Sequence, residues 1–383
     1  MPLQLYVHIP YCLHKCHYCD FNSHAGNDFP WEGYRVALLA ELEHWSDQEQ
    51  FAGRRIHSVF FGGGTPSLAP PKLITGIIEA TSDRFGLTDD AEITLEANPG
   101  TVDIGNFRDY RQAGVNRLSI GVQSLDTGQL QWLERIHSPD EALAAFETGR
   151  TAGFTNINLD LMYGLPGQSV ANWLQTVDTV IGLGPDHLSC YQLTIEPHTR
   201  LADIHRRQPL PLPDDETSLQ FFSTTRQRLA EAGYQPYEIS NFARAGAHCR
   251  HNDGYWLYHD YIGIGAGAAG KWDSSNGGAH RYSNIRSPET YMLQARLHGQ
   301  AVNNHESLGR HMSAAEAVWM GLRRHSGFSR TWFSKRFGLD VLAMFGSELE
   351  TWRQLGHLIV GKDSIRLSES GIVQADSIAA DLF

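Results

Sequence analysis

The chain has 383 residues, of which 41% are hydrophobic and 19% charged, and its formal net charge is −12. This length predicts more than one domain, because single cores stop growing at roughly 250–300 residues. The acidic balance, without any long Lys/Arg run, argues against a nucleic-acid-binding surface. No basic stretch followed by an apolar one opens the chain, and no apolar run approaches the ~20 residues of a membrane span. We therefore expect a soluble cytoplasmic protein without a transmembrane segment.

The first motif is a group of cysteines that follows a strand-like N-terminal run. Cys12, Cys16 and Cys19 lie within eight residues, and only Cys190 and Cys249 occur elsewhere. Where thiols stay reduced, cysteines at this density are metal ligands more often than disulfide partners. Zinc usually takes four protein ligands as two pairs, and no second Cys-x-x-Cys is present. From the residues alone, an iron–sulfur cluster on three thiolates and a zinc site completed by a loop histidine both stay open.

From residue 1 to about residue 235, strand-like and amphipathic helical segments alternate. This succession predicts right-handed βαβ units and a parallel sheet. Six strands without a reversal fit a partial barrel, in which function gathers at the C-terminal ends of the strands. The expected strands cover residues 5–9, 58–61, 92–96, 117–122, 156–162 and 187–194. The expected helices cover residues 31–45, 71–85, 104–113, 140–152 and 170–181.

Glycines and polar residues follow several of these strands. Three consecutive glycines precede Thr65, and such a run lets the backbone approach a ligand closely, although a tight turn alone uses the same residues. Glu96, Gln123 and Asp160 lie at the ends of the third, fourth and fifth strands. Each could simply satisfy backbone groups at the sheet end. Four such strand ends in succession nevertheless favour a shared site at the barrel mouth.

The spacing C-x3-C-x2-C, with an aromatic residue before the third cysteine, resembles the signature of the radical S-adenosylmethionine proteins. The resemblance implies a partial (β/α)6 barrel in which Cys12, Cys16 and Cys19 hold a 4Fe-4S cluster. In that family the open iron of the cluster binds S-adenosylmethionine. By the same resemblance, the contacts to S-adenosylmethionine are Tyr6, Gly63, Gly64, Thr65, Glu96, Gln123, Arg135, Asp160 and Gln192.

Beyond this region the chain changes character. A proline-rich turn leads into an expected helix over residues 216–232, and further on His251-Asn252 precedes Tyr255-Trp256. In a helix, His251 and Tyr255 share one face, as do Asn252 and Trp256. The order resembles the HNxxYW signature of the HemW heme chaperones, a branch related to oxygen-independent coproporphyrinogen III oxidase. The resemblance implies that these four residues bind heme, with His251 as ligand or attachment point. Without it, a buried His and Trp in a domain contact would be the plainer interpretation.

Two positions differ from related patterns. The oxidase carries a further cysteine two positions after the third of its triplet, and Phe21 stands there in this chain. This difference argues against decarboxylation of coproporphyrinogen. Ala269 stands where the family pattern G-x-G-A-H has its histidine, so no role is carried over to that position.

The last part of the chain predicts helices over residues 288–298, 313–325 and 339–355 and a small β-hairpin over 358–367. This order is that of a winged-helix-like module. Because the chain has no basic recognition helix, we expect a lid or a partner surface and not DNA binding. The expected architecture is α/β, with a radical S-adenosylmethionine (β/α)6 barrel over residues 1–235, an HNxxYW-containing extension over 236–305 and a C-terminal winged-helix-like α+β domain over 306–383.

The combined expectation is a heme chaperone that binds heme and transfers it to an acceptor hemoprotein, with a respiratory protein as one candidate. A 4Fe-4S cluster, S-adenosylmethionine and an electron donor complete the expected cofactors and partners. The alternative is an oxygen-independent coproporphyrinogen III oxidase or another radical S-adenosylmethionine oxidoreductase. Whether the protein is an enzyme stays open at this point.

Overall fold

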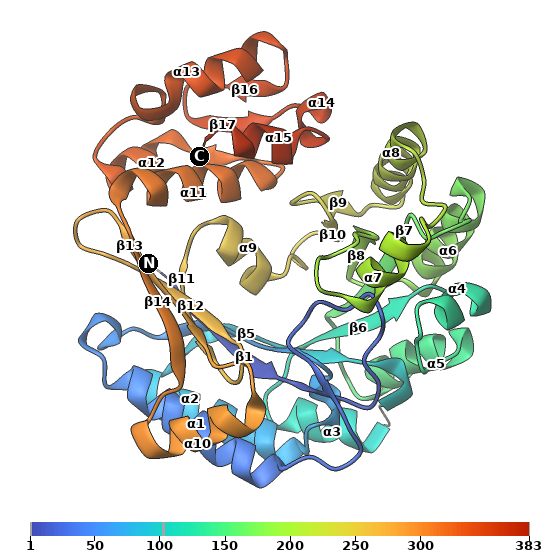
Figure 1. Ribbon diagram of the computed structural model, residues 1–383, viewed down its shortest axis with the longest axis vertical. Helices are drawn as coiled ribbons and strands as arrows, with labels where there is room; N and C mark the ends of the chain where they lie inside the picture. The colour runs from blue at the N-terminus through green and yellow to red at the C-terminus, as the bar shows by residue number, and fades with distance from the viewer. Residues whose placement is uncertain (1, 102–103, 383) are drawn as a thin grey trace.

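A computed structural model describes residues 2–101 and 104–382 (Figure 1). Its central sheet has the strand order β14-β13-β12-β11-β1-β4-β5-β6-β7-β8-β10-β9. Consecutive strands from β1 to β8 in this order pair in parallel, as the βαβ pattern predicts. All six strands expected from the sequence are present, so the partial (β/α)6 barrel is confirmed. These strands are β1 (Leu3–Ile9), β4 (Ile56–Gly63), β5 (Leu87–Ala97), β6 (Arg117–Gln123), β7 (Ile157–Tyr163) and β8 (His187–Gln192).

Helices cover the outer face of this sheet, and the main core lies between the two layers (Figure 1). Leu5 and Val7 of β1 are fully buried in this core with Leu38 of the first helix. The buried Trp173 indole donates a hydrogen bond of 2.6 Å to the Thr225 hydroxyl, which ties α6 to α8. The helices are α1 (Trp31–Ser46), α2 (Pro71–Phe85), α3 (Ile104–Gln112), α4 (Thr127–Trp132), α5 (Pro139–Thr151), α6 (Val170–Leu183), α7 (Arg200–Arg207) and α8 (Asp215–Glu231).

The segment after the barrel extends the same sheet. β11 (Asp260–Ile264) pairs in parallel with β1, and β12 (Ala269–Asp273), β13 (Ala279–Asn284) and β14 (Val302–Leu308) follow in antiparallel order. The alternating glycines of this segment serve close packing: a Cβ on Gly263 would meet the Ala269 carbonyl. Ala269 itself is exposed at the start of β12.

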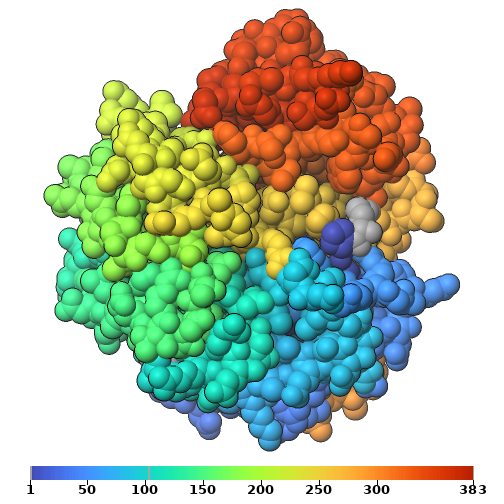
Figure 2. All heavy atoms as spheres, turned by 180° about the vertical axis from the view of Figure 1, so that it is seen from behind, coloured from blue at the N-terminus to red at the C-terminus, as the bar shows by residue number. Residues whose placement is uncertain are grey.

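The C-terminal region forms a second core and a separate lobe (Figure 2). Its order of elements is that of a winged helix, as expected, and β15-β17-β16 make its small sheet. The sequence predicted one helix over 339–355 but missed α12, whose polar and aromatic residues show little periodicity before Gly338 ends the helix. The elements are α11 (Arg310–Arg323), β15 (Phe328–Ser329), α12 (Arg330–Phe337), α13 (Val341–Gln354), β16 (Leu358–Val360), β17 (Ser364–Leu367), α14 (Glu369–Ile372) and α15 (Ala375–Ala380).

The HNxxYW segment is helical and lies between the barrel and this lobe (Figure 1). Helix α9 (Arg250–Trp256) contacts both β4 and α11. No helix in the described part of the chain has the length and apolarity that crossing a membrane would require. The remaining elements are β2 (Tyr11–Cys12), β3 (His24–Ala25), β9 (Gln235–Pro236), β10 (Asn241–Ala243), α10 (Pro288–His298) and 3-10 turns at Glu49–Phe51, Pro66–Leu68 and Pro99–Thr101.

Candidate functional site

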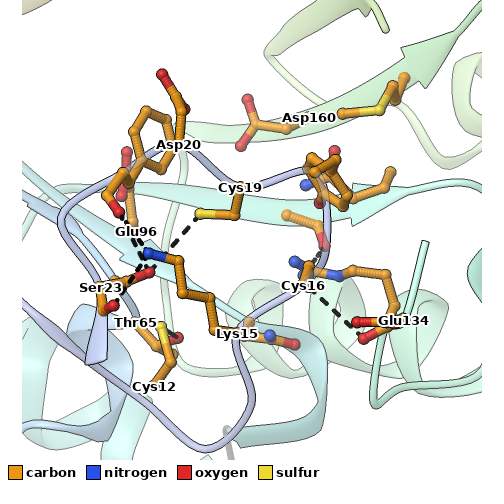
Figure 3. A pocket seen from close by; sticks show the side chains of 18 of the residues that line it. Cys12, Lys15, Cys16, Cys19, Asp20, Ser23, Thr65, Glu96, Glu134 and Asp160 are labelled. Atoms are coloured by element: carbon orange, nitrogen blue, oxygen red, sulfur yellow. Dashed lines mark hydrogen bonds between the residues drawn. The ribbon is translucent and has the colours of Figure 1, made fainter. Parts of the chain in front are cut away.

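A cavity of about 400 Å³ opens at the C-terminal ends of the parallel strands (Figure 3). The three cysteines of the N-terminal loop line it from one side, and Glu96 and Asp160 line it from the strands. The structure therefore brings together most of the residues predicted to hold the cluster and S-adenosylmethionine. Those that line this cavity are Cys12, Cys16, Cys19, Gly63, Gly64, Thr65, Glu96, Gln123, Arg135, Asp160 and Gln192.

Weak polar contacts surround the three cysteines of the loop. The Thr65 hydroxyl donates to the Cys12 Sγ at 3.4 Å, and the Cys16 thiol donates to the Glu134 carbonyl at 3.6 Å. The Cys19 Sγ lies 3.8 Å from the Ser23 hydroxyl. Burial raises the pKa of the Cys12 and Cys16 thiols. Both are therefore thiols in the cofactor-free protein, and a metal must displace their protons to bind.

The glycine-rich loop packs directly on the cysteine loop. The Gly64 N–H donates to the Ile9 carbonyl at 2.8 Å, and the Thr65 N–H donates to the Tyr11 carbonyl at 2.9 Å. Gly63 has φ of +117°, and a Cβ there would lie 2.6 Å from the His8 ring. These glycines are thus required by the approach of the protein's own loop, in addition to any approach of a ligand.

The polar strand ends hold two partly buried carboxyl groups. Glu96 accepts a hydrogen bond of 3.1 Å from the Gly63 N–H, and Asp160 accepts from Ser119 at 3.0 Å and from Asn158 at 2.8 Å. Burial, reinforced by the nearby Asp160 charge, raises the pKa of Glu96 to about 8. Burial also raises the pKa of Asp160. Glu96 is therefore largely protonated at neutral pH and can donate as well as accept a hydrogen bond.

Two further residues at this edge carry marks of a binding site. Gln123 ends β6 with φ of +65°, a conformation that costs a residue with a Cβ on the order of 1 kcal/mol or more. The Arg135 guanidinium donates to the Gly121 carbonyl at 2.8 Å, yet its Nε is buried without a partner. The guanidinium also lies beside the Cys16 and Tyr18 side chains, which raise the pKa of Arg135 and keep it charged at the wall of the cavity.

The donor set fits the cofactors that the sequence predicts. Three thiols face a cavity much larger than one metal ion, and in the described residues no three His, Cys, Asp or Glu side chains are placed around a single-ion site. The Arg135 guanidinium at the cavity wall suits a ligand carboxylate, while Glu96 and Asp160 suit hydroxyl or ammonium groups. These residue types are compatible with a three-thiolate cluster and an amino-acid-bearing nucleoside beside it.

Tyr6 does not line the large cavity. It lines an adjoining cavity of about 140 Å³, which shares Glu96 and Asp160 with the large one. Burial lowers the pKa of His8 to about 4, so the ring is neutral. Its Nε2–H then donates to the Asn22 carbonyl at 2.9 Å, and its Nδ1 accepts from the Tyr6 hydroxyl at 3.0 Å. Tyr6 is therefore committed to holding β1 and the cysteine loop together.

The four residues predicted to bind heme are split between two places. His251, Asn252 and Tyr255 line the small cavity, whereas Trp256 is half-buried beneath the C-terminal lobe, with the Arg323 guanidinium 4.9 Å from the centroid of its ring. A volume of 140 Å³ is below the roughly 300 Å³ of small-molecule sites. The small cavity therefore has no room for a whole macrocycle in this conformation.

His251 is 2% exposed, and both of its ring nitrogens are occupied. Nδ1 lies 2.9 Å from the Ser58 Oγ, and Nε2 lies 3.0 Å from the Tyr255 hydroxyl. Burial lowers the pKa of His251 to about 3, so the ring is neutral. Its role as a heme ligand stays a prediction, and ligation would require one of these two hydrogen bonds to break.

The sequence analysis did not identify several residues that line the two cavities. Arg117, at the start of β6, is 2% exposed and lines the small cavity. Lys15 and Glu134 line the large one. Lys15 lies between two cysteines of the loop, and Arg117 is a charged residue that opens an apolar strand. The latter pattern is a signal that sequence reasoning could have used, because a buried cation needs a partner.

Comparison with known proteins shows which protein superfamily the chain resembles. Residues 6–180 match the radical SAM superfamily. Coproporphyrinogen III oxidase (HemN) from Escherichia coli, a radical SAM enzyme, has the same fold, with a TM-score of 0.83 at 24% identity over 100% of this chain and 90% of its own. The fold is therefore that of a radical SAM protein.

Closer relatives narrow this class to one family. The heme chaperone HemW of Escherichia coli (strain K12) is 45% identical over 78% of each chain, and HemW of Haemophilus influenzae is 38% identical over 97% of this chain and 95% of its own. The mitochondrial radical S-adenosyl methionine domain-containing protein 1 of Bos taurus is 36% identical over 99% and 86%. The chain belongs to the HemW family.

Proposed function

We propose that the protein is a cytoplasmic heme chaperone, which binds heme as cargo and transfers it to an acceptor hemoprotein, with a respiratory protein as one candidate. The observation that carries the proposal is the position of the HNxxYW helix. Helix α9 lies against a cavity that adjoins the cysteine-lined one, in a chain whose relatives of 38–45% identity are heme chaperones by name. Cargo and cofactors would thus occupy neighbouring sites.

Phe21 favours this function over the oxidase. Its side chain is 59% exposed and lines the large cavity, where the oxidase pattern would place a cysteine. An exposed aromatic ring offers a surface for stacking or apolar contact. It offers no thiol for cluster or substrate chemistry.

In the proposed protein, Cys12, Cys16 and Cys19 hold the 4Fe-4S cluster, and Arg135 with the strand-end residues holds S-adenosylmethionine. These groups, when bound, supply one-electron chemistry, for which a separate electron donor is required. The chain contributes positioning: the Thr65 hydroxyl directs its proton at the Cys12 Sγ. The arginine also places a positive charge near Cys16, which opposes the effect of burial on that thiol.

Heme binding at α9 requires this helix to move or open. Its outer side is held by the C-terminal lobe, since the Arg324 Nε donates to the Asp253 carboxylate at 2.7 Å. We propose that the domain over residues 306–383 is a lid on α9. Its displacement would widen the small cavity and let the Tyr255 hydroxyl withdraw from His251. The chain would then have a neutral imidazole ready for the iron of the cargo.

Heme transfer under anaerobic conditions tests the function. Heme-loaded protein is mixed with an apo-hemoprotein, the two are separated, and the Soret absorbance of each is followed. We expect the acceptor to gain the heme that this protein loses, and coproporphyrinogen III to stay unchanged with S-adenosylmethionine and a reductant. Turnover of coproporphyrinogen without heme transfer would instead establish the oxidase.

A further inference from the structure

The small cavity contains a buried cation that the proposed function does not use. The Arg117 side chain enters from the start of β6, is 2% exposed, and its Nε has no hydrogen-bond partner. In the part of the chain that the structure describes, no carboxylate forms an ion pair with Arg117. Burial disfavours this charge, but the nearby Cys249, Glu92, Tyr237 and Asp160 offset that effect and raise the pKa of Arg117, so the guanidinium stays charged while its Nε lacks a hydrogen-bond acceptor.

The acidic groups around Arg117 are committed to other donors. Both oxygens of Glu92 accept hydrogen bonds from the first two backbone N–H groups of α9, at 2.9 and 3.0 Å. The two oxygens of Asp160 accept from Ser119 and Asn158. They act on Arg117 only through space. The guanidinium therefore keeps its donors for something that enters the cavity.

A second donor faces the same cavity. The Gln4 amide donates to the Ser58 Oγ at 3.1 Å, so the Ser58 hydroxyl hydrogen is available to the His251 Nδ1. The neutral His251 then carries its proton on Nε2 and donates it to the Tyr255 oxygen. The hydrogen of the Tyr255 hydroxyl is left without an acceptor in this chain of bonds. Tyr255 and Arg117 thus present an O–H and a guanidinium to one small space.

The size of the cavity limits what these donors can bind. A volume of about 140 Å³ admits a side chain of a few heavy atoms, such as a propionate group, and is too small for a macrocycle. A guanidinium with a nearby hydroxyl is a common arrangement for recognising a carboxylate.

We propose that this cavity is a carboxylate-binding subsite, in which Arg117 and Tyr255 hold a propionate side chain of the tetrapyrrole cargo. The identity of the cargo rests on the proposed function, whereas the affinity for a carboxylate does not. Because the cavity shares Glu96, Ser119 and Asp160 with the large one, the side chain enters from the barrel mouth. The macrocycle itself stays outside the small cavity.

Thermal unfolding of the full-length protein with propionate tests the subsite without heme. We expect propionate to raise the melting temperature progressively with the logarithm of its concentration above the Kd, whereas uncharged propionamide and sodium chloride at equal ionic strength do not. In Arg117→Met this rise should vanish, and the melting temperature without ligand should fall, since Glu92 and Asp160 lose the cation that compensates their charges. Arg150→Met is the matched control, because Arg150 pairs with Asp186 away from the cavity. It should melt lower and keep the propionate response.

Two outcomes would overturn the subsite. One is an equal effect of propionate and propionamide on wild type. The other is an unchanged propionate response of Arg117→Met, which would mean that Arg117 serves only the fold. If Arg117→Met does not fold, Tyr255→Phe provides the second variant. It should weaken the propionate response several-fold, and an unchanged response would also overturn the proposal.

Comparing the binding affinities of heme and of its dimethyl ester shows whether the carboxylate belongs to the tetrapyrrole cargo. If the source is the cargo, heme should bind wild type about tenfold or more tightly than the ester, and this ratio should fall to about one in Arg117→Met. Equal binding of heme and ester, with propionate still protective, would overturn the tetrapyrrole source and leave a site for a free small carboxylic acid. Absence of any heme binding, with propionate still protective, would instead contradict the proposed function.

Discussion

Gly64 lies directly against Cys12: a Cβ at Gly64 would be 3.0 Å from the Cys12 Sγ and 2.7 Å from the Tyr11 carbonyl oxygen. The cysteine loop and the glycine-rich loop are thus fitted to each other before any cofactor binds. We expect Gly64→Ala to push the cysteine loop outward and to lower the iron and labile sulfide retained after anaerobic reconstitution to a small fraction of wild type. Inductively coupled plasma analysis and a sulfide assay would measure this loss.

Gly182→Ala provides the control for that change. Gly182 is in α6, and a Cβ there meets no atom within 4 Å. This variant should retain the full cluster and gain about 0.5–1 kcal/mol of stability, because alanine is the better helix former. Full iron and sulfide in Gly64→Ala would show that the cysteine loop can shift without loss of the cluster.

The ligand assignment makes a separate prediction. Cys16→Ala should remove the broad visible absorption of the reconstituted protein, together with most of its iron and sulfide. Cys190→Ala, whose thiol is buried in the barrel core, should keep them. About one zinc and no labile sulfide in wild type would contradict the cluster and return the zinc site to consideration.

Glu96 should make stability depend on pH. The pKa of Glu96 is raised from the ordinary 4.5 to about 8 in the folded protein, so the fold holds this proton more tightly than the unfolded chain does. The resulting stabilisation is full below about pH 4.5 and is lost as the pH rises through about 8. Glu96→Gln has no such proton, so its free energy of unfolding should rise relative to wild type by a few kcal/mol between about pH 5 and pH 9.

Chemical denaturation of the cofactor-free proteins at several pH values would measure this difference, and parallel profiles for the two proteins would contradict a Glu96 that is protonated in the folded state at neutral pH. The same variant should bind S-adenosylmethionine more weakly than wild type. Gain of stability with loss of affinity is the pattern expected of a carboxyl group kept in place for a ligand.

The ion pair between Arg324 and Asp253 should couple the C-terminal lobe to α9. The two side chains are only 21% and 19% exposed and form two hydrogen bonds, of 2.7 and 3.2 Å. A double-mutant cycle with Arg324→Ala and Asp253→Ala should give a coupling of about 1 kcal/mol or more. The exposed pair Arg353–Glu350 is the control and should give about 0.5 kcal/mol or less. Equal couplings in the two cycles would remove the basis for a lid held through Asp253.

Much of the barrel could be predicted because its signals are local. Each parallel strand is a short apolar run followed by an amphipathic helix, and glycines or carboxylates mark the strand ends. Strand β14 gave no such signal, since its residues from Asn303 to Ser307 are polar and exposed. Its pairing with β13 depends on partners that are distant in sequence, which no local pattern encodes.

The residues of the functional site were likewise predictable from the sequence only in part. The cysteines and most residues expected to contact S-adenosylmethionine do line one cavity, because they sit at strand ends that the parallel topology brings together. The hydrogen bonds of Tyr6 and His251 within the protein could not be predicted from the sequence. Their hydroxyl and ring nitrogens are occupied by His8, Ser58 and Tyr255, and such pairing is decided by packing between distant segments.

The central claim is tested most directly by an anaerobic heme titration of the reconstituted protein, followed by the Soret band after gel filtration. Wild type should retain about one heme per chain, and His305→Ala, which changes an exposed histidine on β14, should do the same. His251→Ala should lose the band or shift it strongly. No retained heme in wild type would contradict the chaperone, and equal binding by wild type and His251→Ala would place the heme ligand elsewhere.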